Sequence, residues 1–94
     1  MAAAEALARE AEALEAHALE LRRGELGYII LDTFARMPGW DPSLPLEGTS
    51  PNDALRNPKA CGWAARLLAG TPAERRACEL DARAKALREE AARC

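Results

Sequence analysis

Three cysteines and a single histidine are the side chains of this sequence best suited to nucleophilic or metal-binding chemistry. Cys61, Cys78 and Cys94 are 17 and 16 residues apart, so they form neither a Cys-x-x-Cys pair nor a known zinc-binding spacing. Their odd number leaves at least one thiol without an intramolecular disulfide partner. Free thiols are typical of reducing compartments, which predicts a cytoplasmic location.

Cys61 is the cysteine with the clearest local context. Asn57 followed by Pro58 is typical of a helix start, with Asn as the capping residue and Pro at the first helical position. Cys61 is then expected in the first turn of a helix that ends at Gly70, where backbone N–H groups and the helix dipole stabilise a thiolate. A thiolate in such a position can ligate haem iron. The alternative is a small buried thiol that only packs in the core.

The residues around Cys61 resemble the cysteine-ligand loop of haem-thiolate proteins. Residues 56–63, RNPKACGW, are similar to the Arg-Asn-x-x-x-Cys stretch of nitric oxide synthases, except that a glycine follows the cysteine directly. The resemblance implies that Cys61 is the axial ligand of the iron and that Trp63 packs near the ring. It also implies that the propionates face a basic side chain, either Arg56, Lys59 or Arg66.

His17 is a second candidate ligand. It lies in the stretch 2–23, which contains no Gly or Pro, and it flanks the row of leucines that ends at Leu21. Imidazole is a common proximal ligand of haem iron. Antiparallel pairing of the first and last helices would instead place His17 near Cys78, where it could activate the thiol as a nucleophile. A partly exposed histidine without a special role is the third interpretation. We predict no catalytic residue.

The composition predicts that these side chains are carried by helices. Ala, Leu, Glu and Arg account for 57 of the 94 residues, and Val and Gln are absent. All four are strong helix formers, whereas the β-branched residues typical of strands are scarce. This four-residue composition and the repeated proline-marked helix starts resemble those of computationally designed helical bundles. A natural protein from a GC-rich bacterium is the alternative origin.

Two long helices with matching seams are expected at the ends of the chain. In residues 2–23, leucines recur every seven residues and alanines take the alternate seam positions, a pattern that lets a partner helix approach closely. Gly24 is expected to end this helix, with Arg22 beside its negative terminus. Residues 72 to near the C-terminus repeat the seam. We expect the two helices to pack antiparallel, residue i against about residue 95 − i.

The start of the last helix carries a capping box. Thr71 caps the helix, Pro72 takes the first helical position, and Glu74 completes the box. Along the outer face of this helix, Asp81 and Lys85 are spaced to form an ion pair four residues apart.

The middle of the chain is expected to be a helix, a loop and short helices. Residues 25–37 show helical spacing of large apolar residues, although 28–31 could also be a strand, and Pro38 should stop the helix. Residues 38–50 form a Pro-rich loop whose Trp40, Leu44 and Leu46 are expected to fold back over the core. A short helix at 51–56 precedes the one that begins at Asn57. Residues 1–94 are therefore predicted to be one all-α domain, a four-helix bundle-like array of long, medium, short and long helices.

Charge and motifs exclude several function classes. The net charge is −2, which argues against a nucleic-acid surface, and no apolar run is long enough to span a membrane. Phosphate-binding, hydrolase and zinc-protease motifs are absent. The sequence does not decide whether the chain is an enzyme of another kind.

Two functions remain. The first is a monomeric bundle that binds haem, a small-molecule cofactor, with Cys61 as its metal ligand and His17 as the alternative. The second is a ligand-free structural or protein-interaction module, which an exposed apolar patch around Trp40 and Leu44 would favour.

Overall fold

The computed structural model describes residues 2–34 and 36–93, and in these residues the chain is all-α, as predicted. The helices are α1 (Ala2–Thr33), α2 (Pro51–Arg56), α3 (Gly62–Leu68) and α4 (Pro72–Arg93), with a 3₁₀ turn, η1 (Pro58–Ala60), before α3. The lengths run long, short, short, long. The separate medium helix predicted at 25–37 is therefore wrong, because its first part belongs to α1.

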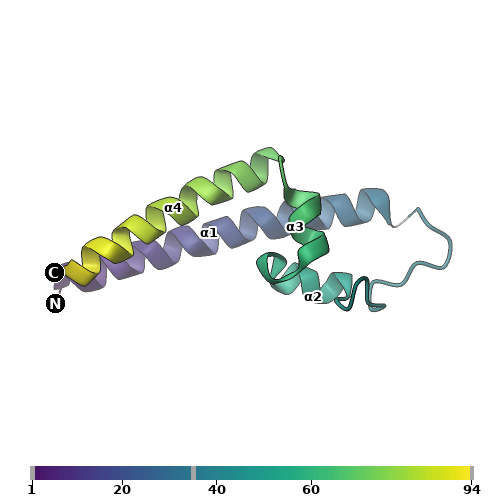
Figure 1. Ribbon diagram of the computed structural model, residues 1–94, viewed down its shortest axis with the longest axis horizontal. Helices are drawn as coiled ribbons and strands as arrows, with labels where there is room; N and C mark the ends of the chain where they lie inside the picture. The colour runs from purple at the N-terminus through teal and green to yellow at the C-terminus, as the bar shows by residue number, and fades with distance from the viewer. Residues whose placement is uncertain (1, 35, 94) are drawn as a thin grey trace.

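The molecule is elongated, with extents of 55 × 22 × 16 Å. α1 and α4 lie side by side and antiparallel, so the start of α1 and the end of α4 lie at the same end of the molecule (Figure 1). α2 and α3 pack on the second half of α1, beyond the start of α4 (Figure 1). Two small cores result, one between α1 and α4 and one between α1, α2 and α3.

Alanines form the contact between α1 and α4. Ala11 and Ala18 of α1 and Ala77 and Ala84 of α4 are fully buried, and Leu80 packs with Ala18 and Ala77. Because an alanine side chain is small, the two backbones approach closely, as the repeated seam predicts. The predicted antiparallel pairing is confirmed, with contacts that average about one helical turn from the predicted register.

The predicted end of the first helix at Gly24 is wrong. α1 continues through Gly24 and Gly27 to Thr33, and the strand alternative for this segment is also excluded. Each glycine inside a helix costs about 1 kcal/mol relative to alanine. The burial of Leu26 and Ile30 in the core with α2 and α3 offsets this loss of helix stability. Burial of each side chain is worth about 1.5–3 kcal/mol.

The loop from Met37 to Thr49 is ordered by aromatic packing. Trp40 stacks on Phe34 at a ring-centroid distance of 6.3 Å, and both pack with Leu46 against the second core. Leu46 and Thr49 exchange backbone hydrogen bonds across a short turn. The expectation that Leu44 also covers the core is wrong, since Leu44 is 58% exposed.

Prolines start the short helices after the loop, Pro51 in α2 and Pro58 in η1. The residues after Asn57 do not form the one continuous helix that was predicted. The Ser50 hydroxyl accepts a hydrogen bond from the Asp53 N–H at 3.2 Å and caps α2. The Asn57 side chain makes no capping hydrogen bond, and the chain forms the 3₁₀ turn η1 before α3 begins at Gly62. Cys61 therefore precedes α3 in an extended conformation, and its predicted place in the first helical turn is wrong.

The capping box at α4 is half formed. The Thr71 hydroxyl accepts a hydrogen bond from the Glu74 N–H at 3.1 Å, as predicted. The second half is missing, because the Thr71 N–H donates to the Leu68 carbonyl and the Glu74 carboxylate binds Arg22 of α1. A charged partner on the neighbouring helix thus replaces the local hydrogen bond.

The close contact along the alanine seam is testable with one pair of variants. Ala84→Leu places a larger side chain in the fully buried seam, and overpacking should lower the free energy of unfolding by about 1–3 kcal/mol. Ala82→Leu makes the same change at an exposed position of the same helix and should stay within about 0.5 kcal/mol of the parent. Equal stabilities in urea unfolding would contradict a closely packed seam.

Candidate functional site

Cys61 and Trp63, the predicted haem ligand and ring contact, both lie in the second core. Cys61 is 2% exposed and is surrounded by apolar residues of α1, α2 and α3. The Trp63 indole N–H donates to the Thr49 carbonyl at 3.2 Å, and its ring packs edge-on to Phe34. Both side chains thus have structural partners.

The other predicted haem contacts are at the surface, and of these Arg66 lines a hollow of about 300 Å³ together with Trp63. Arg56 is exposed beside Asp53, and Arg66 is exposed and ion-paired with Glu47. His17 is exposed on α1, outside the Cys61 cluster, and no hydrogen bond is found for it among the described residues. The structure thus brings Cys61 and Trp63 together but not His17.

The packing around Cys61 does not fit a haem as the chain is folded. Apolar side chains already occupy the space around the buried thiol, so an iron could reach the sulfur only if part of the second core opened. Within residues 2–34 and 36–93, no cluster of three or more His, Cys, Asp or Glu side chains is placed to hold a metal ion.

Cys78 lies near an arginine rather than near His17. Its Sγ is 3.7 Å from Nη2 of Arg22, and the thiol is exposed. Cys94 lies outside the described residues. Among the described residues, no helix has the length and apolar character needed to cross a membrane.

Arg22 forms a charge cluster between α1 and α4 that the sequence analysis missed. Its side chain is buried, with Nε 2.7 Å from a Glu74 oxygen and Nη1 2.6 Å from an Asp81 oxygen. Burial alone would lower the pKa of Arg22, but the hydrogen bonds to Glu74 and Asp81 outweigh it and raise that pKa. Arg22 follows Ala18 by one turn on the buried face, and this spacing was the available signal.

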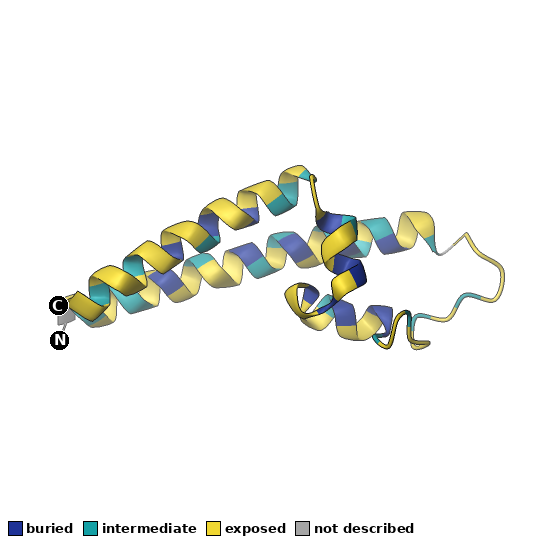
Figure 2. Ribbon diagram, viewed as in Figure 1, coloured by how far each residue is buried: buried dark blue, intermediate teal, exposed yellow. Residues whose placement is uncertain are grey.

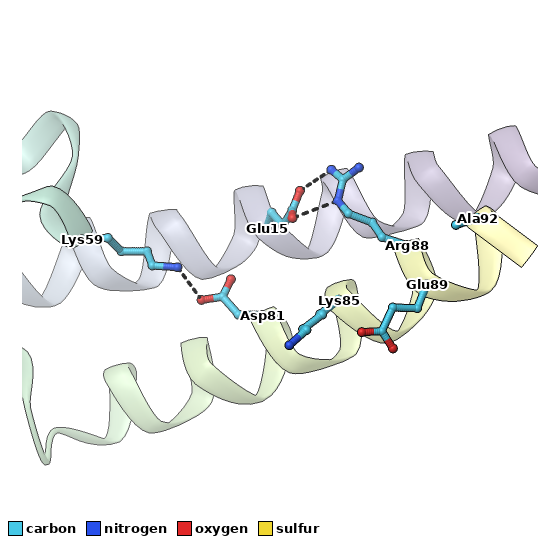
Figure 3. Close-up of a pocket in the computed structure, with 7 residues that line it drawn as sticks. All are labelled: Glu15, Lys59, Asp81, Lys85, Arg88, Glu89 and Ala92. Atoms are coloured by element: carbon cyan, nitrogen blue, oxygen red, sulfur yellow. Dashed lines mark hydrogen bonds and ion pairs between the residues drawn. The ribbon is translucent and has the colours of Figure 1, made fainter.

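A groove of about 560 Å³ continues from this cluster between α4, α1 and η1 (Figure 3). Asp81 at its edge binds Lys59 at 3.5 Å as well as Arg22, so the predicted Asp81–Lys85 pair is wrong. Glu15 and Arg88 form a two-pronged ion pair across the groove, which lowers the pKa of Glu15. The lining holds three basic and three acidic side chains, so it selects neither anions nor cations.

Large apolar side chains are exposed at the end of the molecule that holds the last turns of α1 and the loop. Tyr28 and Leu31 of α1 are 68% and 65% exposed, and Met37 and Leu44 of the loop are also exposed. We call these four residues together with Trp40 the distal apolar surface. Figure 2 shows that exposed positions predominate in the loop beyond α1.

Two hollows make this surface uneven. One, of about 300 Å³, lies between α1 and α2 and is lined by Leu31, Trp40 and Leu55 among others. The second, also about 300 Å³, lies within the loop and is lined by Met37, Trp40 and Leu44 among others. Trp40 forms a wall of both hollows, so the distal apolar surface offers knobs and holes side by side.

Comparisons with models of known protein families, with curated proteins and with solved structures find no match for this chain.

The charge cluster predicts an unequal effect of two neighbouring arginines on stability. Arg22→Met removes a buried cation and leaves the Glu74 and Asp81 carboxylates without it, at a cost of about 1–3 kcal/mol in the free energy of unfolding. Arg23→Met removes an exposed cation with one partner and should change stability by less than about 0.5 kcal/mol. Similar losses in the two variants would show that Arg22 does not hold α1 and α4 together.

Proposed function

We propose that this chain is a protein-interaction module that binds the apolar face of a helix on its distal apolar surface. The observation that carries the proposal is the exposure of Tyr28, Leu31, Met37 and Leu44 at one end of a small domain. Single exposed leucines are ordinary, but a contiguous apolar patch on a small protein is typical of an interaction site. An exposed patch near Trp40 and Leu44 is also the feature that the sequence analysis associated with this function.

The shape of the surface favours a helical partner. The hollow between α1 and α2 is lined mostly by apolar side chains and lies next to the exposed Leu31. An amphipathic helix lays side chains three and four residues apart into such a groove. Burial of one leucine-sized anchor contributes about 1.5–3 kcal/mol to binding.

Haem ligation by Cys61 is the competing proposal, and the surroundings of the thiol do not favour it. Ligation would require exposure of a side chain that is now inside the second core. If bound, a haem would bring redox or ligand-binding chemistry to this end of α3. Cys61 would then hold the iron and Trp63 would border the ring.

Hemin titration of the folded chain separates the two proposals. We expect no absorbance change that depends on Cys61, because the thiol is covered. His17→Ala should likewise match the parent. A reduced carbon-monoxide complex with a strongly red-shifted Soret band, lost in Cys61→Ala and kept in His17→Ala, would establish thiolate ligation instead.

Selection of helical peptides tests the interaction function. A phage library of amphipathic helices is selected on the full chain, and the recovered peptides are titrated against variants by fluorescence anisotropy. Leu31→Glu and Leu44→Glu should each weaken binding about tenfold or more, because each places a charge in the apolar contact. Ala86→Glu, at an exposed position of α4, is the matched control and should bind like the parent.

Peptides that bind the parent and all three variants equally would place the contact elsewhere on the chain. Failure to recover any binding peptide would contradict a helix-binding surface.

A further inference from the structure

α1 contains two glycines that the fold of one chain does not require, the exposed Gly24 and the half-buried Gly27. Gly24 lies inside the helix without a positive φ, and a Cβ at this position would meet nothing within 4 Å. A Cβ at Gly27 would make only an ordinary contact, 3.8 Å from Cδ2 of Leu55. Glycine destabilises a helix relative to alanine. The small size of these residues therefore has no evident use within the monomer.

Two large exposed side chains follow these glycines on the same face. Gly24, Tyr28 and Leu31 are four and three residues apart, which places them one above the other on the helix. Leu26 and Ile30 point away from them into the second core. α4 begins at Pro72 and contacts α1 at Arg22 through its first turn, so the part of α1 beyond Gly24 extends past it (Figure 1). This face of α1 is therefore open.

The pattern on this face is complementary to itself. When two copies of α1 lie antiparallel about a two-fold axis between Gly27 and Tyr28, Leu31 of one copy is level with Gly24 of the other. Tyr28 is likewise level with Gly27 of the second copy. Each large side chain then lies against a position without a side chain, and the same surface serves both copies, as a two-fold contact requires.

The surface area of the chain is consistent with a missing partner. The accessible surface is 6167 Å², whereas a compact monomer of 10.2 kDa exposes ~5,300 Å². The excess of about 850 Å² belongs to the whole elongated chain, and the open face of α1 with Tyr28 and Leu31 contributes part of it.

We propose that the chain forms a symmetric dimer in which the Gly24, Gly27, Tyr28 and Leu31 face of α1 packs antiparallel against the same face of a second copy. This inference rests on the proposed interaction function and names its partner. The sequence analysis expected a monomer instead.

Sedimentation equilibrium of the full chain across the micromolar range tests the dimer. The parent should approach the dimer mass at the highest concentrations, and Leu31→Glu should remain monomeric throughout. Gly24→Leu should also be monomeric, because its side chain occupies the place of Leu31 from the other copy. Ala86→Glu is the matched control, since it adds the same charge at an exposed position of α4 outside the proposed contact and should leave the dimer unchanged.

Gly24→Ala tests the dimer with a substitution that should stabilise the helix of the monomer. At low concentration it should raise the Tm by a few degrees, because alanine favours the helix and meets no neighbour. At high concentration it should weaken the dimer. Far-UV circular dichroism confirms that each variant retains its helices. A parent that is monomeric at every concentration, or a dimer unaffected by both Leu31→Glu and Gly24→Leu, overturns the proposal.

The orientation is tested by disulfide cross-linking in a Cys78→Ser, Cys94→Ser background that retains the buried Cys61. Copies carrying Gly24→Cys are mixed with copies carrying Leu31→Cys and oxidised. The antiparallel contact predicts cross-links between the two kinds of copy, whereas a predominance of cross-links between two copies of the Gly24→Cys variant contradicts it. A monomeric parent that still binds helical peptides through Leu31 would overturn the dimer and leave the proposed function standing.

Discussion

The structure depends on the continuity of α1 through Gly24 and Gly27. The first half of this helix packs on α4 through alanines, and the second half packs on α2 and α3 through Leu26 and Ile30. No other described helix takes part in both cores. The two cores therefore keep a fixed relation only if the helix does not bend at its glycines. Arg22 lies two residues before the first glycine and ties this stretch to α4 through two carboxylates.

The exposed surface is a consequence of the same arrangement. α1 is 32 residues long and α4 is 22, so an antiparallel pair that starts level at the chain ends leaves the last turns of α1 uncovered by α4. α2 and α3 bury only one side of these turns. The stacking of Trp40 on Phe34 anchors the loop at the end of α1, and Met37 and Leu44 of the loop are exposed beside Trp40. Fold and candidate site are thus linked through the difference in helix length.

Features set by a few neighbouring residues, or by a repeat along one helix, could be predicted from the sequence. The alanine seam follows from a seven-residue repeat, and the Thr71 and Ser50 caps follow from side chains that accept hydrogen bonds from nearby N–H groups. The caps are local and the seam contacts are repeated along the helix, so one altered contact does not change the predicted helix start or the predicted helix pairing.

The features that could not be predicted depend on which side chains meet in three dimensions. Gly24 indicates a helix end because its local cost is visible in the sequence, whereas the burial of Leu26 that outweighs it is not. In the sequence, Arg22 has the character of a surface residue. Its burial depends on the ion pairs with Glu74 and Asp81 of α4, which are distant in the sequence. The position of Cys61 depends on a 3₁₀ turn, and the exposure of Leu44 depends on the packing of Trp40. The sequence analysis therefore named a patch near Trp40 and Leu44 only as a feature that would favour an interaction function, expected both residues to cover the core, and did not include the α1 residues.

Amide hydrogen exchange along α1, resolved by residue with NMR, tests the continuity of this helix most directly. A single helix that joins two cores predicts that the amides of Gly24 to Gly27 exchange as slowly as those of the buried positions on either side, Ala18 and Ile30. Rapid exchange confined to Gly24–Gly27, between two protected segments, would contradict the account. It would mean that α1 is two helices joined by a flexible link and that no fixed surface connects them.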